Sequence, residues 1–431
     1  MRKRLFLLFL AVLLIIPLAV SCSSGGKKLM TLDDSSISVN IFQYYLAKRK
    51  GEIASSLSVG SAALNDSYWD TIVSDDGKTT LDDVLCAEVL ELVKLKLAAA
   101  NTFDRMGLKI SKEDLAVIDE EIEELVEFDA DGSKNEFNRI LANYGINLKI
   151  LREIRILELK VAKLSEQLYG EGGAKIADSL KEEYYRENYV RFKQIFMYTH
   201  KFVYEKDEFG TEIWYKEDGT VSYDTKNGKT KESGGKPVTD ADGKTVYFDD
   251  DGKIAYSPSG ASRRHVYNEN GQEKTEAYSS EKINELLEKA NGIMSRTVEE
   301  EYVLFDSLIA ENNEDKGLDA YPNGFYVSRD SVYDKKVIEA LFDMKDGEIR
   351  LVYSDLGIHI LMRYPAEEGG YALESNKDFF IDPKTGGYHF MDALVDKLFK
   401  AYLTESVASI KVNESLLEEI SMKSVGPNYD Y

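Results

Sequence analysis

Apolar side chains recur at every third or fourth position between about residues 36 and 189, which is the period of α-helices that bury one face. The clearest stretch follows Thr80, a residue type that caps helices, and carries Val84, Leu85, Val89, Leu92, Val93 and Leu97. The chain has no proline between Pro17 and Pro237, and proline would interrupt helix interiors. The pattern therefore predicts a helical domain over residues 36–189.

The pattern changes at Val190, and residues 192–197 are typical of a β-strand. The following segment, 202–278, is rich in Tyr, Asp, Gly and Lys and contains turn dipeptides at Asp218-Gly219, Asn227-Gly228, Asp242-Gly243, Asp251-Gly252 and Asn270-Gly271. Within it, residues 214–223 recur weakly as residues 247–256, each copy with an aromatic strand, an Asp-Gly turn and a second strand. We expect an insertion built of β-hairpins.

Helical periodicity returns twice after the insertion. The first stretch begins near Ser280 and carries Ile283, Leu286, Leu287 and Ala290; the second covers about 390–408 and carries Leu394, Leu398, Tyr402 and Leu403. The whole pattern predicts an α+β protein in which a helical N-terminal domain is followed by a mixed domain over 190–365 and a C-terminal segment over 366–431.

The first 22 residues have the three parts of a secretory signal. Arg2, Lys3 and Arg4 precede an apolar run to Ile16, and small residues lead to Cys22. A cysteine at this place resembles a bacterial lipobox, which implies removal of residues 1–21 and lipidation of Cys22. The chain would then be anchored to the outer face of a bacterial cell membrane, with 22–35 as a flexible tether. The alternative is an ordinary secretory signal that contains a cysteine.

The charge and the scarcity of cysteine and histidine exclude several classes of function. The net charge of −23 becomes −26 when the three basic residues of the signal are removed, which argues against nucleic acid as a partner and against electrostatic binding to anionic lipid. Cys86 is then the remaining thiol, and we interpret it as a small buried apolar residue. The four histidines lie at 200, 265, 359 and 389, too far apart for a zinc motif, so we expect no metal and no cofactor. Asp249–Gly252 lacks the spacing of a calcium loop.

Residues 280–364 contain four short motifs in a recognisable order. They are Phe305-Asp306-Ser307-Leu308-Ile309 with Asp315, Asn323-Gly324-Phe325, Ala340-Leu341-Phe342, and Gly347-Glu348-Ile349 followed by Gly357-Ile358-His359-Ile360. This order and spacing resemble the parvulin family of peptidyl-prolyl isomerases. The resemblance implies a four-stranded sheet with four helices, into which the segment 202–278 is inserted after the first strand.

The layout of the whole chain resembles extracytoplasmic foldases of the PrsA/SurA type. In such proteins the N-terminal helices form a chaperone module, and a C-terminal helix packs back onto that module. The resemblance implies that the partners are unfolded or newly secreted polypeptides.

The catalytic positions of the parvulin family are carried over only in part. His359 matches the C-terminal histidine, Asp315 the Cys/Asp position and Ser354 a hydroxyl position. The first histidine of the family is replaced by Gln194, which forms hydrogen bonds but does not titrate. The alternatives are that His359 is a structural histidine and that Asp315 is a turn or cap residue.

The substrate-binding positions depart further from the family. Phe342 matches a wall of the proline pocket, whereas Tyr333 and Val337 fall near its Met and Phe, and Asn323 lies in the counterpart of a Gly-rich stretch. We also hypothesise that the insertion forms a flap beside this pocket.

The sequence therefore predicts a membrane-anchored foldase that binds unfolded secreted proteins and isomerises their Xaa-Pro bonds. The first alternative is a holdase chaperone whose parvulin domain is catalytically degenerate, as Gln194, Tyr333 and Val337 suggest. The second is a cell-surface binding lipoprotein that uses its tyrosine-rich hairpins.

Overall fold

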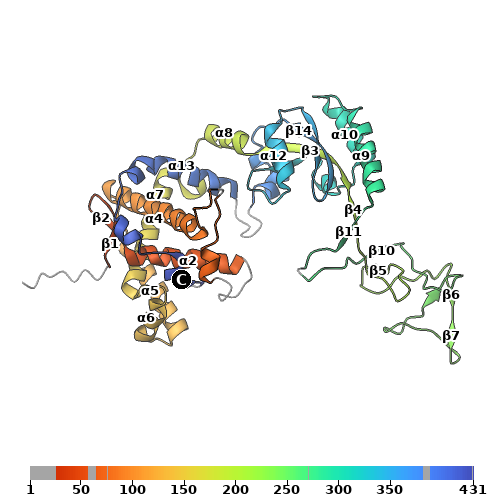
Figure 1. The fold of residues 1–431 in the computed structure, drawn as a ribbon, viewed down its shortest axis with the longest axis horizontal. Helices are drawn as coiled ribbons and strands as arrows, with labels where there is room; N and C mark the ends of the chain where they lie inside the picture. Colours follow the sequence, from red (N-terminus) through yellow and green to blue (C-terminus); the bar gives the residue numbers. More distant parts are fainter. Residues whose placement is uncertain (1–25, 57–64, 75, 270, 382–388, 430) are drawn as a thin grey trace, which may run out of the picture. The chain divides into compact units, whose positions relative to one another are not determined.

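The computed structural model describes residues 26–431 except 57–64, 75, 270, 382–388 and 430 (Figure 1). The chain divides into two compact units, Met1–Lys181 with Asp382–Tyr431, and Glu182–Ile381. The expected signal peptide and Cys22, the expected site of lipidation, lie outside the described residues. Within the described part, no helix has the length and apolar character needed to cross a lipid bilayer.

The first unit is mainly helical. Its helices are α2 (Val39–Ser56), α3 (Asp66–Trp69), α4 (Leu81–Arg105), α5 (Lys112–Ala130), α6 (Lys134–Ala142), α7 (Leu148–Tyr169), α13 (His389–Ala408) and α14 (Glu414–Leu417), with single 3-10 turns at Glu171–Gly173 and Met422–Ser424. Thr80 caps α4 as predicted: its side chain accepts from the Asp83 amide, and the Asp83 carboxylate accepts from the Thr80 amide. Phe399 and Leu403 of α13 lie in one core with residues of α2, α4 and α7.

A small sheet completes this unit and corrects the sequence analysis. Strand β1 (Lys28–Leu32) pairs antiparallel with β2 (Ser35–Ser38) and with β15 (Lys411–Val412). Residues 28–35, predicted as part of a flexible tether, are therefore structured. Leu29 and Met30 are almost completely buried. The partner strand β15 comes from the other end of the chain, so the local sequence gave no indication of this pairing.

The second unit contains a four-stranded antiparallel sheet in the order β12-β3-β14-β13. The strands are β3 (Val190–Tyr198), β12 (Phe325–Val327), β13 (Ile349–Tyr353) and β14 (Gly357–Tyr364), and the helices are α9 (Ser280–Met294), α10 (Tyr302–Asn312), α11 (Gly317–Ala320) and α12 (Lys335–Asp343). Short 3-10 helices follow at Gly370–Ala372 and Glu374–Phe379, and α8 (Asp178–Asn188) leads into the unit. The fold is thus α+β, as predicted.

Each face of this sheet is covered by different helices, as Figure 1 shows. Side chains of a strand alternate between the faces. Ile195 and Ile360 belong to a core with α9 and α10, whereas Phe192 and Leu361 belong to a core with α12. The central strands β3 and β14 are therefore buried on both sides, and they hold their polar residues in fixed positions.

The segment 202–278 consists of short paired strands, as expected. Strands β4 (His200–Phe202) and β11 (Thr275–Ala277) pair at its base, followed by the pairs β5 (Trp214–Lys216) with β10 (Ala261–Arg263), β6 (Lys229–Thr230) with β9 (Tyr247–Phe248), and β7 (Glu232–Ser233) with β8 (Lys236–Pro237). The two repeats are hairpins of the same kind, because Gly219 and Gly252 both have positive φ in turns closed by backbone hydrogen bonds.

Candidate functional site

The strand register brings Gln194 and His359 together. His359 on β14 is paired with Phe196 on β3, and Gln194 is paired with Leu361. The two polar side chains are thus diagonal neighbours on the face that α12 covers, a separation that long side chains can bridge. Both are 2 % exposed, so each needs hydrogen-bond partners inside the protein.

A continuous chain of hydrogen bonds supplies these partners. The Ser354 hydroxyl lies 2.8 Å from His359 Nε2, and His359 Nδ1 lies 2.8 Å from Gln194 Oε1. Gln194 Nε2 then donates to Asp315 Oδ2 at 2.7 Å and to the Tyr333 hydroxyl at 3.0 Å. Five side chains from β3, β14 and three connecting segments therefore form one network.

Donors and acceptors in this network can be assigned by starting from the Asp315 carboxylate, which only accepts hydrogen bonds. A Gln194 amide rotated by 180° would place its oxygen against the Asp315 carboxylate, so its nitrogen must face Asp315. Gln194 Oε1 then accepts, which requires His359 to carry its proton on Nδ1. Nε2 is left to accept the Ser354 proton, while the Ser354 oxygen accepts from the Leu356 amide at 3.1 Å.

Burial keeps the imidazole neutral. Desolvation lowers the pKa of His359 from 6.5 to about 4, and the charges of Asp334 and Asp315 offset this effect only in part. At neutral pH the site therefore holds a directed chain of hydrogen bonds around a neutral imidazole, not an imidazolium that could act as an acid.

The Tyr333 hydroxyl ends this chain of hydrogen bonds. Burial raises the pKa of Tyr333 to about 12, so its proton is retained at neutral pH. The oxygen accepts from Gln194, and no hydrogen bond made by its own proton is found within the described part of the chain. The ring packs on Phe192 at 5.9 Å between centroids, which fixes the position of this donor.

A cavity of about 420 Å³ opens above the network. It is lined by Gln194, Phe196, Tyr198, Asp315, Val332, Tyr333, Asp334, Leu356 and His359. Its volume is in the range of small-ligand sites, roughly 300–1,000 Å³. Val332 and Leu356, which are 94 % and 55 % exposed, form an apolar rim over a polar floor. This combination suits a small apolar ring whose attached amide needs hydrogen bonds.

Three residues predicted to bind substrate lie outside this cavity. Val337 is completely buried in the core beneath α12, because the helix starts after its cap Asp334 and turns this residue inward. Phe342 packs on the same core, with the Arg329 guanidinium 4.3 Å from its ring centroid. The Asn323 carbonyl accepts from Arg191 Nε at 2.7 Å. Val337, Phe342 and Asn323 therefore do not line this cavity, whereas Tyr333 does.

Sequence reasoning missed the walls that do line the cavity. Phe196 and Tyr198 follow Gln194 at alternate positions of β3, so strand periodicity could have indicated them. Val332 and Leu356 lie in connections, where periodicity says nothing about direction. Among the described residues, no group of three or more His, Cys, Asp or Glu is placed to hold a metal ion.

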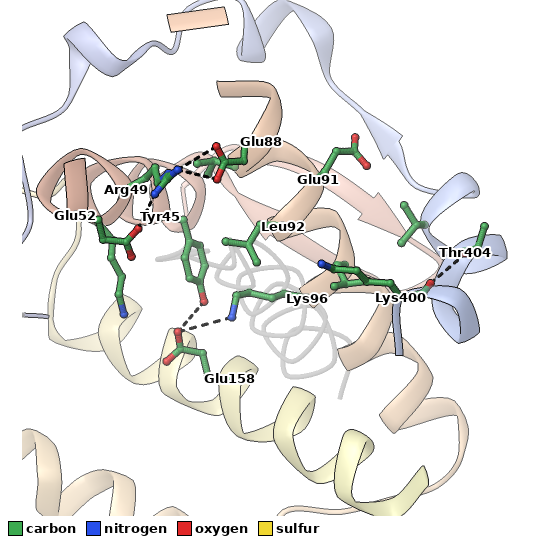
Figure 2. A pocket seen from close by; sticks show the side chains of 14 residues that line it. Tyr45, Arg49, Glu52, Glu88, Glu91, Leu92, Lys96, Glu158, Lys400 and Thr404 are labelled. Atoms are coloured by element: carbon green, nitrogen blue, oxygen red, sulfur yellow. Dashed lines mark hydrogen bonds and ion pairs between the residues drawn. The ribbon is translucent and has the colours of Figure 1, made fainter. Parts of the chain in front are cut away.

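The helical unit has a second cavity, of about 650 Å³, between α2, α4, α7 and α13 (Figure 2). It is lined by Tyr45, Lys48, Arg49, Glu52, Glu88, Val89, Glu91, Leu92, Leu95, Lys96, Glu158, Lys400, Thr404 and Val407. Figure 2 shows the Tyr45 hydroxyl and the Lys96 ammonium both directed at Glu158, at 3.1 and 4.0 Å. Burial lowers the pKa of Lys96. The cavity thus combines apolar walls with internally paired charges.

Comparison with known proteins finds similarity to solved structures alone. No family model and no curated protein matches the chain. The structures include the foldase protein PrsA from Streptococcus pneumoniae (11 % identity, TM-score 0.20), PrsA from Bacillus subtilis (15 %, 0.18) and the peptidylprolyl isomerase PrsA from Bacillus cereus (12 %, 0.26). Each match covers 81 % of this chain and 97 %, 93 % and 96 % of the respective structure.

Proposed function

We propose that this chain is an extracytoplasmic foldase that isomerises Xaa-Pro bonds in unfolded polypeptides and also holds such polypeptides. The observation that carries the proposal is the Tyr333 hydroxyl. It is a neutral donor at the wall of a small cavity with an apolar rim, and the hydrogen bond from Gln194 to its oxygen holds it there.

Rotation about a prolyl bond needs no covalent intermediate. The barrier is about 18–20 kcal/mol because the nitrogen lone pair is delocalised into the carbonyl group. When the amide twists, this lone pair becomes localised on nitrogen and can accept a hydrogen bond that the planar amide cannot accept. A fixed donor at that position therefore stabilises the transition state more than the ground state, and this difference accelerates rotation.

The network assigns a role to each of its members. Tyr333 is the donor to the twisted amide, and the apolar rim at Val332 and Leu356 holds the proline ring. Gln194 donates to the Tyr333 oxygen, which orients the hydroxyl and polarises its proton. His359 and Asp315 fix the two ends of the Gln194 amide, so they are positioning residues, as is Ser354 behind His359. Because no proton leaves the network, replacing a histidine by Gln194 is compatible with catalysis.

The holding activity is assigned to the helical unit. Its cavity of about 650 Å³ has apolar walls at Val89, Leu92 and Leu95, which suit the side chains of an unfolded segment. Some of its rim charges are paired with each other, as between Arg49 and Glu88 at 3.1 Å. Anchoring at Cys22 on the outer face of a membrane belongs to the same proposal and rests on the sequence of the first 22 residues.

Two conservative substitutions test the catalytic role. Tyr333→Phe removes the donor but keeps the ring, and it should lower kcat/KM for a proline-containing peptide about tenfold to a hundredfold. Tyr353→Phe is the matched control, because Tyr353 is a half-exposed residue of β13 outside the cavity. NMR exchange between the cis and trans forms of the peptide measures both. Equal rates of catalysed cis–trans exchange for the wild-type chain and Tyr333→Phe would contradict the role assigned to the Tyr333 hydroxyl.

One observation favours a holdase without isomerase activity. The buried position of Val337 leaves the cavity without a wall from α12. A holdase would prevent aggregation of an unfolded protein equally well with and without the Tyr333 hydroxyl. In the NMR assay it would not accelerate cis–trans exchange above the uncatalysed rate. The surface-binding alternative has less support, because one ring face of Tyr204, Tyr215 and Phe248 is already covered by Arg263, Arg264 and Lys231, respectively.

A further inference from the structure

Aromatic side chains continue without interruption from the cavity into the insertion. From Gln194 onward, alternate residues are Phe196, Tyr198, His200, Phe202 and Tyr204, and strand alternation places such residues on one face. His265, which is bridged to Tyr204 across the strands, joins them. These six residues, 196, 198, 200, 202, 204 and 265, are called the aromatic ladder.

Ring contacts connect every member of the ladder. The ring centroid of Phe196 lies 4.7 Å from those of His359 and Tyr198, and the Tyr198 and Phe202 centroids are 5.4 Å apart. Phe202 stacks on His265 with 5.0 Å between ring centroids, and His265 makes an edge contact with Tyr204 at 4.8 Å between centroids. Four steps of this size reach at most about 20 Å, the length of about six extended residues.

The ladder is accessible to a ligand. Phe196 is buried at the floor of the cavity, but the other five rings are only partly buried, and Arg263 covers just one face of the Tyr204 ring. Partly exposed aromatic residues in a continuous row are unusual for a surface that binds nothing, since isolated apolar side chains are the normal case. Continuity with the cavity places this row where a polypeptide would run beyond its proline.

Carboxylates without cationic partners border the start of the ladder. Asp315 accepts from Gln194 and the Gly317 amide, Glu314 from the Tyr198 amide, and Asp334 from the amides that begin α12. None of the three forms an ion pair with lysine or arginine among the described residues. Their negative charge is therefore available to attract a basic side chain beside the cavity.

We propose that the aromatic ladder is an extension of the isomerase cavity that binds the client segment next to the proline, preferring extended segments with aromatic or proline rings and basic side chains. The proposal rests on the proposed function and adds the class of substrate. Rings of such a segment stack on the ladder, lysine and arginine are attracted by the aromatic faces and by the carboxylates, and acidic segments are repelled.

The test uses the full chain and three unphosphorylated peptides. One has four residues with a single proline. The second has ten residues, with phenylalanine and lysine beside the same proline, and the third replaces each lysine by glutamate. We expect kcat/KM to be about tenfold higher for the lysine peptide than for the short one, with no such gain for the glutamate peptide.

Substitution of Phe202 then tests whether the aromatic ladder causes the preference for the lysine peptide. Phe202→Ala should lower the ratio of kcat/KM for the lysine and short peptides from about ten to about one. Phe202→Leu, which keeps an apolar side chain of similar size, should do the same if stacking is the cause, and covers the case that the alanine variant does not fold. Phe209→Ala is the control, since Phe209 is an exposed residue of the same insertion outside the ladder. An unchanged ratio in Phe202→Leu, or an equal gain for the glutamate peptide, would overturn the proposal.

A binding measurement separates this inference from the proposed function. Fluorescence anisotropy of the labelled lysine peptide gives its Kd, which Phe202→Leu should raise about tenfold while Phe209→Ala leaves it unchanged. If the wild-type chain does not isomerise the short peptide, the proposed function fails, and the ladder is still supported or refuted by these Kd values.

Discussion

The low pKa of the His359 imidazole predicts how the free energy of unfolding depends on pH. Its imidazole is 2 % exposed and accepts from Ser354 while donating to Gln194, so protonation of Nε2 would break one of these bonds and bury a charge. The pKa falls from 6.5 to about 4. By linkage this difference corresponds to about 3 kcal/mol of unfolding free energy.

The sign follows from which state binds the proton. Between pH 4 and 6.5 the unfolded chain protonates its histidine, whereas the folded site stays neutral. The contribution of His359 to the stability of the folded protein is therefore complete above about pH 6.5 and is lost progressively as the pH falls toward 4. Isomerase activity should remain constant from pH 7 to pH 5, because His359 stays neutral over that range.

Side-chain NMR of histidine nitrogens measures this directly. We expect one resonance pair, assigned through His359→Gln, to show the Nδ1-protonated tautomer at pH 7 and to titrate near pH 4. Urea unfolding of the wild-type chain should lose about 3 kcal/mol more than His359→Gln between pH 7 and pH 4. A His359 pKa near 6.5, or the other tautomer, would refute the hydrogen-bond directions derived above.

Three further substitutions test other parts of the structure. Gln194→Leu keeps the side-chain volume but removes the central partner of the network. It should lower the free energy of unfolding in urea by about 1–3 kcal/mol and lower kcat/KM at least as much as Tyr333→Phe. An active variant would show that the network is dispensable. Val337→Ala should destabilise the protein by about 1–3 kcal/mol through a core cavity with KM unchanged, whereas a raised KM would restore Val337 to the substrate pocket. Met30→Ala should destabilise by about 2–5 kcal/mol because Met30 is buried where β1 meets β15, and an unchanged thermal unfolding midpoint would support the flexible tether after all.

Local patterns predicted the elements of this fold well. The helical period and the Thr80 cap located α4, and the Asp-Gly turns located the hairpins, because both signals act over a few residues. Strand β1 was missed: it pairs with the short strand β2 and with β15, and β15 lies about 380 residues further along the chain.

The site shows the same division between local and distant information. Motifs identified His359, Asp315, Gln194, Ser354 and Tyr333, and the structure brings all five into one network. The structure places Val337 and Phe342 on the core and not at the cavity, because the direction of a helix face depends on the sheet beneath it. The aromatic ladder was visible in the alternation from residue 194 to 204, but its continuity required the contact with His265 from the far side of the insertion.

Prolyl isomerisation by the wild-type chain is the most direct test of the central claim. Exchange spectroscopy on an unphosphorylated Xaa-Pro peptide, with the folded protein added in catalytic amounts, measures the rate of cis–trans interconversion against the uncatalysed rate. We expect clear acceleration at pH 7 that persists at pH 5, since the His359 imidazole is neutral at both. An uncatalysed rate in the presence of folded protein would contradict it and leave a holding function for the helical unit.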